Sequence, residues 1–285
     1  MNIRDLFNNL DRSGIEKWCR DQAQVTYLGD HRALCRVLGK YLMYVDTRDL
    51  SLAPHMMMNG FWEMWVTQVI VDYVKPGMRC IDVGANCGYY TLLLADLAGD
   101  KGSVHAYEPV PELVSVLRNS MAVNGHGTHS VLARAASDHQ GTAEFFARRN
   151  FSGSGSLDKF EGSTKFSDYR GGLPICQIDD DLVLVQTEPN KIKPIDFVKI
   201  DVQGHELKVL AGMRRAIEMS PKIAIAMEFS PAEHESPVMA LDTIRGMGLK
   251  IQAIGTDGQV RSISQEEAAK PDTGDHRMLW LTREA

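Results

Sequence analysis

The chain is short of cysteine and of long apolar runs, and each shortage excludes a class of protein. It has 5 cysteines in 285 residues, an odd number with no C-x-x-C spacing, which argues against a disulfide framework or a zinc cluster. No uninterrupted apolar run approaches the roughly 20 residues of a spanning helix. The first residues, MNIRDLFNNLDRSG, lack the apolar core of a secretory signal. We therefore expect a reduced, soluble, cytoplasmic protein without a membrane span.

An excess of positive charge is also missing. Lysine and arginine number 31 against 37 acidic residues, which gives a net charge of −6. Sequence-independent binding of nucleic acid needs a basic surface, so we expect no nucleic-acid partner. The hydrophobic fraction of 44% and the charged fraction of 24% are ordinary for a soluble globular chain. The length suits one large or two small domains.

Short apolar segments alternate with helical ones from residue 79 onward. Five of these segments are predicted to be strands: Arg79–Val83, Ser103–Tyr107, Ser130–Ala135, Ile195–Ile200 and Lys222–Met227. Strands that alternate with helices predict an α/β fold with a mainly parallel sheet covered on both faces. Leu249–Ile254 and Met278–Thr282 are expected to close that sheet as paired strands.

The pattern divides the chain into two parts. Residues 1–60 are expected to form an N-terminal cap, with a hairpin of Leu34–Val37 and Tyr41–Val45 around Gly39-Lys40. Residues 61–285 are expected to form the main domain. Within it, residues 147–190 are too long for an ordinary connection and are rich in glycine and serine, so they are either a functional loop or an added hairpin. We expect this insertion to face the substrate.

The turn after the first strand is the most informative stretch. It reads Asp82-Val-Gly84-Ala-Asn86-Cys-Gly88, and its glycines allow a ligand close to the backbone at the start of a new helix. An ordinary strand–helix turn would also use glycine. The spacing differs from the G-x-G-x-x-G of dinucleotide-binding proteins, which disfavours an NAD-dependent oxidoreductase. The D-x-G-x-N-x-G order resembles the first motif of Rossmann-like S-adenosylmethionine (SAM) methyltransferases, in which the acid and the turn hold the methionine part of the cofactor.

Two further strand ends are expected to border the same crevice. The second strand ends at Glu108, where an acid is placed to bind both ribose hydroxyls, although a Glu before Pro is also common in surface turns. The third strand is expected to end at Ala135, and the small residues Ala136 and Ser137 that follow would seat the adenine. A plain turn explains these residues equally well.

The motifs together resemble the FkbM family of SAM-dependent methyltransferases. The resemblance covers residues 60–230 and is carried by five segments: Gly60-Phe-Trp-Glu63, Asp82-Val-Gly-Ala-Asn-x-Gly-Tyr-Tyr-Thr91, Tyr107-Glu-Pro, Ile178-Asp-Asp and Lys199-Ile-Asp-Val-Gln-Gly-His-Glu206. It implies a Rossmann-like methyltransferase fold with a seven-strand sheet and an antiparallel last strand. It also implies SAM as cofactor, with Thr91 in the cofactor motif, and methylation of a hydroxyl on a glycan or natural product. Gln203 departs from the family, which commonly has Glu there.

The end of the fourth strand carries the candidate catalytic residues. A hydroxyl acceptor must lose its proton to a base or bind a metal. Asp201 ends that strand at the edge where open α/β sheets bind ligands, and we expect it to contact the cofactor and act in catalysis. His205 follows as a second candidate base. Asp201 would otherwise cap the next helix, and His205 would be an exposed helical residue.

Two more acids lie near the crevice. Glu63 is expected to hydrogen-bond the cofactor, unless it merely belongs to the apolar helix predicted over Phe61–Val74. Glu228 ends the fifth strand, and with Asp201 it offers oxygen ligands to magnesium. Two carboxylates are not a metal site, so no metal is predicted.

Alternatives to a glycan or small-molecule hydroxyl stay open from the sequence. A nitrogen or lipid-linked acceptor, or a non-catalytic SAM-binding module that recruits partners through residues 1–60, fits the same motifs. A homodimer also stays open.

Overall fold

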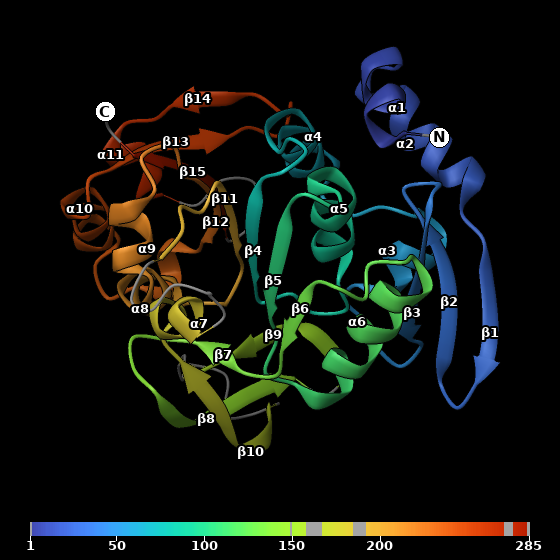
Figure 1. Ribbon diagram of the computed structural model, residues 1–285, viewed down its shortest axis with the longest axis horizontal. Coiled ribbons are helices and arrows are strands. Elements are labelled where there is room, and N and C mark those ends of the chain that lie inside the picture. The colour runs from blue at the N-terminus through green and yellow to red at the C-terminus, as the bar shows by residue number, and fades with distance from the viewer. Residues whose placement is uncertain (1, 149, 158–166, 185–191, 271–275, 284–285) are drawn as a thin grey trace.

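An eight-stranded sheet forms the centre of the computed structural model, which describes residues 2–148, 150–157, 167–184, 192–270 and 276–283 (Figure 1). The strand order is β14-β13-β15-β12-β11-β4-β5-β6. The strands span β4 Arg79–Val83, β5 Ser103–Tyr107, β6 Ser130–Leu132, β11 Phe197–Ile200, β12 Ala224–Phe229, β13 Leu249–Ile254, β14 Val260–Ser262 and β15 Arg277–Arg283. Strands β14 and β15 run opposite to the other six, so the pairs β12–β15, β15–β13 and β13–β14 are antiparallel and the remaining pairs are parallel. The predicted mainly parallel sheet with an antiparallel last strand is confirmed, and β14 adds an eighth strand at its edge.

The central strands are apolar along their whole length because both faces of the sheet are covered. Cys80 and Ile81 are neighbours in β4 yet belong to the two opposite cores. Each face carries its own helices. The first core includes α4 (Met64–Tyr73), α5 (Tyr89–Ala98) and α6 (Pro111–Val123), and the second includes α8 (Glu206–Gly212), α9 (Arg214–Met219) and α10 (Pro237–Gly246).

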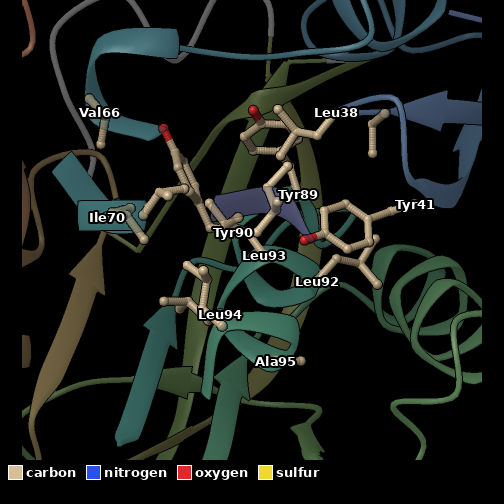
Figure 2. Close-up of a cluster of buried hydrophobic side chains, with 14 of the residues drawn as sticks. Leu38, Tyr41, Val66, Ile70, Tyr89, Tyr90, Leu92, Leu93, Leu94 and Ala95 are labelled. Carbon is tan, nitrogen blue, oxygen red and sulfur yellow. The ribbon is translucent and has the colours of Figure 1, made fainter. Parts of the chain in front are cut away.

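Helix α5 is buried on every side, which explains why its sequence is apolar all round. Figure 2 shows its side chains between those of α4, such as Ile70, and two residues of the N-terminal part, Leu38 and Tyr41. The Tyr41 hydroxyl donates to Asp96 Oδ2 at 2.8 Å, on the same helix. The N-terminal part therefore shares a core with the main domain.

The N-terminal part consists of α1 (Ile3–Asn9), α2 (Arg12–Gln22), a sheet β1-β2-β3 and α3 (Ala53–Met58). In the sheet, β1 spans Val25–Gly29, β2 Arg32–Val37 and β3 Tyr41–Asp46. The predicted hairpin is confirmed as the antiparallel pair β2–β3. Arg4 anchors this part by donating to the carbonyls of Val71 at 2.8 Å and Val74 at 2.5 Å, which end α4 without partners inside the helix.

The predicted third strand, Ser130–Ala135, is wrong at its end. Strand β6 stops at Leu132, where the Arg134 N–H turns back to the Leu132 carbonyl. Ala135–Ala136 then forms β7 of a second sheet, parallel to β10, because its partners Ile175 and Cys176 lie there.

That second sheet has the order β7-β10-β8-β9, with β8 at Gly141–Arg148, β9 at Phe151–Ser156 and β10 at Ser167–Cys176. It is followed by α7 (Ile178–Leu184). The described residues of the predicted insertion thus include strands, which begin before residue 147. That the insertion faces the substrate stays a prediction. None of the described helices is both long and apolar enough to cross a bilayer.

Candidate functional site

A cavity of about 500 Å³ opens at the carboxyl ends of the parallel strands. Residues at the carboxyl ends of β4, β5, β11 and β12 form its floor, which is the edge where open α/β sheets bind ligands. Its rim comes from two segments far apart in the chain, Asp46–Leu52 and Phe145–Leu157. The rim includes part of the predicted insertion, but it also includes N-terminal residues in which the sequence showed no signal.

The turn after β4 lies so close to the residue that follows the neighbouring strand β11 that it needs glycine. Gly84 has φ +79°, and a Cβ at this position would lie 1.9 Å from the Asp201 carbonyl oxygen. Asn86 also has a positive φ, of +51°. Gly84 and Asn86 line the cavity, and their binding of a cofactor stays a prediction.

Gly88 has a different surrounding. Its φ is +100°, and a Cβ would lie 2.2 Å from Leu117 Cδ1 on α6. Gly88 therefore allows α5 to begin against α6, and it is not among the described residues that line the cavity.

Asp82 and Thr91 pair beneath the turn. Thr91 Oγ1 donates to Asp82 Oδ2 at 2.5 Å, and both side chains are buried. Burial raises the pKa of Asp82 to about 6. Neither residue is among the described residues that line the cavity, so the pair connects β4 to α5 below the floor.

Glu108 organises the turn from the second strand. Its Oε2 accepts the Asn86 N–H at 2.9 Å and its Oε1 accepts the Val110 N–H at 2.8 Å. The side chain is buried but lines the cavity. The Glu108 carboxylate thus fixes the backbone of the turn at the edge of the cavity.

The small residues after β6 also reach the cavity, although from the second sheet. Ala135 and Ala136 line it, whereas Ser137 lies behind them. Ser137 Oγ is 2.9 Å from His205 Nε2. His205 precedes α8, is 5% exposed and lines the cavity, so it is not the exposed helical residue of the alternative interpretation.

The end of β11 brings a buried ammonium to a carboxylate. Lys199 Nζ is 3.2 Å from Asp201 Oδ2 and 5.2 Å from the centre of the Tyr90 ring. Burial alone would lower the pKa of Lys199, but Asp201, Glu63 and Glu228 outweigh burial and raise it. The Asp201 side chain remains 29% exposed and lines the cavity, so it is accessible to a ligand.

Glu63 and Glu228 lie close together at the cavity. Glu63 accepts a hydrogen bond from Tyr90 Oη at 2.7 Å, and burial raises its pKa. Burial, followed by the charge of Asp201, raises the pKa of Glu228 well above its ordinary value. Carboxylate oxygens of these residues and a ring nitrogen of His276 lie within 4.8 Å of one another, a spacing that suits a cation.

Tyr90 and His276 line the cavity without having been predicted individually, although Tyr90 lies in a motif shared with the family. Arg148 and Ser156 were predicted only as part of the insertion at residues 147–190. Gln203 was noted from the sequence only because it departs from the glutamate that the family commonly has at this position. Its Nε2 is 2.7 Å from Glu228 Oε1 and 3.2 Å from Asp201 Oδ1.

Comparison with known proteins adds a family match. The family described as "Methyltransferase FkbM domain" matches residues 82–268. A protein-L-isoaspartate O-methyltransferase of Methanococcoides burtonii is 32% identical over 82 residues, which are 28% of this chain and 36% of that protein. The hexuronic acid methyltransferase AglP of Haloferax volcanii is 29% identical over 156 residues, 55% of this chain and 58% of that protein. Both matches span less than two thirds of the relative.

Among solved structures, TYW2 of M. jannaschii in complex with AdoMet is similar with a TM-score of 0.47 and 12% identity. The match covers 91% of this chain and 88% of that one.

Proposed function

This chain belongs to the FkbM family of methyltransferases, and we propose that it transfers a methyl group from SAM to a hydroxyl of a glycan or small natural product. The family match over residues 82–268 supports the reaction class. The observation that carries the proposal is the single cavity in which the Gly84 turn, Glu108 and Asp201 meet. A methyl donor and an acceptor can be brought together there at the short, aligned distance that displacement requires.

The residues of the floor fit SAM. The turn at Gly84 has no room for a Cβ. The Glu108 carboxylate lines the cavity at the end of the second strand, where an acid can bind ribose hydroxyls. Ala135 and Ala136 offer small apolar surface for an adenine. Bound SAM supplies a methyl group on a positively charged sulfur. Glu63 and Asp201 would face such a cation, because both carboxyl groups line the cavity.

Asp201 is the better placed of the two candidate bases. Lys199 holds its Oδ2, while Oδ1 accepts from Gln203 and has a further lone pair toward the cavity. We assign to Asp201 the proton of the acceptor hydroxyl. His205 Nε2 is already within hydrogen-bond distance of Ser137 Oγ, so His205 is assigned to shaping the acceptor side of the floor.

The rim supports a polar acceptor. It combines an aromatic ring, Phe151, with hydrogen-bonding groups of Ser152 and Asn150 and the guanidinium of Arg148. Guanidinium groups bind carboxylates in paired hydrogen bonds. A uronic acid is therefore our first choice of sugar, in line with the hexuronic acid named for the Haloferax relative.

Transfer of label from [methyl-³H]SAM to p-nitrophenyl β-D-glucuronide and to the matching β-D-glucoside tests the function. We expect label on the glucuronide that survives alkali, because a methyl ether is stable where a methyl ester is hydrolysed. Label that alkali removes would indicate a methyl ester, and the acceptor would then be the carboxyl group instead of a hydroxyl. If neither sugar is labelled, fractions of a native extract take their place, and no transfer to any carbohydrate or small-molecule fraction would refute the proposal.

A further inference from the structure

The Gln203 side chain bridges two carboxylates at the cavity. Its Nε2 donates to Glu228 Oε1 at 2.7 Å and to Asp201 Oδ1 at 3.2 Å. An amide nitrogen carries two hydrogens, so it can make both bonds at once. Because Lys199 donates to the other oxygen of Asp201 at 3.2 Å, the Asp201 carboxylate is held from both sides.

The backbone of Gln203 is fixed as firmly as its side chain. Ser156 Oγ, at the end of β9, donates to the Gln203 carbonyl at 2.6 Å. The next residue, Gly204, donates its N–H to Glu206 Oε1 at 2.9 Å. Gln203 has φ +52°, a conformation that residues other than glycine seldom adopt. The second sheet and α8 thus both help to aim this amide at the two acids.

The surroundings of Asp201 are rich in negative charge. The carboxyl groups that act on it come from several elements: Glu63, Asp82, Glu206, Glu228 and Glu233. Among the described residues, Lys199 is the one ammonium in this group, and His276 faces Glu63. Carboxyl groups this close do not all ionise easily. A neutral amide stabilises ionised oxygens without adding another charge.

We propose that Gln203 is a positioning residue of the methyl transfer, which keeps the Asp201 carboxylate turned toward the acceptor while separating it from Glu228. The inference rests on the proposed role of Asp201 as base. A glutamate, common in the family at this position, would accept rather than donate unless it carried a proton. Gln203 therefore makes the arrangement independent of the protonation of its own side chain.

The test compares Gln203→Glu with the double variant Gln203→Glu/Glu228→Gln, which again has one amide and one carboxyl group. We expect the acid limb of the kcat–pH profile of Gln203→Glu to move upward by about one pH unit, so that kcat is about tenfold lower at pH values on that limb. The double variant should move back toward the wild type. A merely structural role would lower the melting temperature and leave the limb in place. An unmoved acid limb in a folded Gln203→Glu protein would overturn the inference.

A second measurement does not need methyl transfer. A third carboxyl group with a raised pKa costs stability as the pH rises above its unfolded value of about 4.3. The melting temperature of Gln203→Glu should therefore fall further below that of the wild type between pH 5 and pH 8, and the double variant should close this gap. If the wild type transfers no methyl group, the proposed function fails. A gap that is constant with pH refutes the inference about Gln203 even in a wild type that transfers methyl groups.

Discussion

The carboxylate of Asp49, in the N-terminal part, accepts the backbone N–H of Ser152 in β9 at 2.8 Å. Ser51 Oγ adds a contact of 3.1 Å to Ser152 Oγ and accepts the Gly153 N–H at 3.0 Å. These bonds join residues about a hundred positions apart into one rim around the cavity. The N-terminal part is therefore in a position to influence which acceptor enters.

Asp49→Ala should weaken both the fold and acceptor binding. Asp49 Oδ2 also accepts the N–H groups of Leu52 and Ala53 at 2.9 Å each, at the start of α3. The loss of a cap costs about 1 kcal/mol, and each further hydrogen bond costs about as much, so we expect a loss of about 2–3 kcal/mol in urea unfolding. KM for the acceptor should rise severalfold with less change in kcat. Ser51→Ala keeps the bonds of Asp49 to the start of α3, so it should raise KM at a smaller cost in stability. An unchanged KM in both variants would show that the rim does not contribute to acceptor binding.

Gly84→Ala should abolish SAM binding. The added Cβ would meet the Asp201 carbonyl at 1.9 Å, and φ is +79°. Gly125 is a matched control, because its φ is +80° but no atom lies within 4 Å of a Cβ built there. Gly125→Ala should cost about 1–2 kcal/mol of stability through its backbone alone and bind SAM normally by calorimetry. Equal SAM affinities in the two variants would contradict the proposal that the turn at Gly84 binds SAM.

Glu206→Gln should make the protein less sensitive to rising pH. Burial raises the pKa of Glu206 to about 8, whereas an unfolded glutamate titrates near 4.3. The folded state therefore holds its proton more tightly, and the wild type loses stability as the pH rises from about 4.3 toward 8. The glutamine variant avoids this loss, so relative to the wild type it should gain about 1 kcal/mol or more between pH 5 and pH 8.

Melting temperatures at the two pH values provide the measurement. Glu218→Gln, an exposed glutamate of α9, is the control and should show no such gain. A difference between Glu206→Gln and the wild type that stays constant with pH would argue against a protonated Glu206.

Asp201→Asn should reduce turnover far more than cofactor affinity. The loss of a general base typically costs about 10²–10⁴-fold in rate, while the amide still fits the space between Lys199 and Gln203. Single-turnover transfer with a saturating acceptor measures the first effect and calorimetry with SAM the second. The melting temperature must be checked as well, because the substitution removes the buried Lys199 pair. Undiminished turnover would show that Asp201 is not the base, and His205 would be the next residue to test.

Local sequence patterns were sufficient to predict most of the elements that form the floor of the cavity. Continuous apolar runs predicted the strands of the main sheet, and the glycine spacing predicted the turn at Gly84, because both signals lie within a few residues of each other in the chain. The same reasoning failed at Ala135, where the chain leaves the main sheet. Its partner Ile175 lies 40 residues further on, and no local pattern records such a pairing.

The sequence by itself determined that this is an α/β methyltransferase with a glycine turn and strand-end acids at one edge of its sheet. Only the tertiary structure decided which of these residues meet. It put Asp82 and Thr91 under the floor, brought Asp49 to Ser152, and set the Gln203 amide between Asp201 and Glu228. The reason is physical: periodicity encodes burial and local backbone conformation, whereas hydrogen bonds between distant segments depend on how sheets and helices pack.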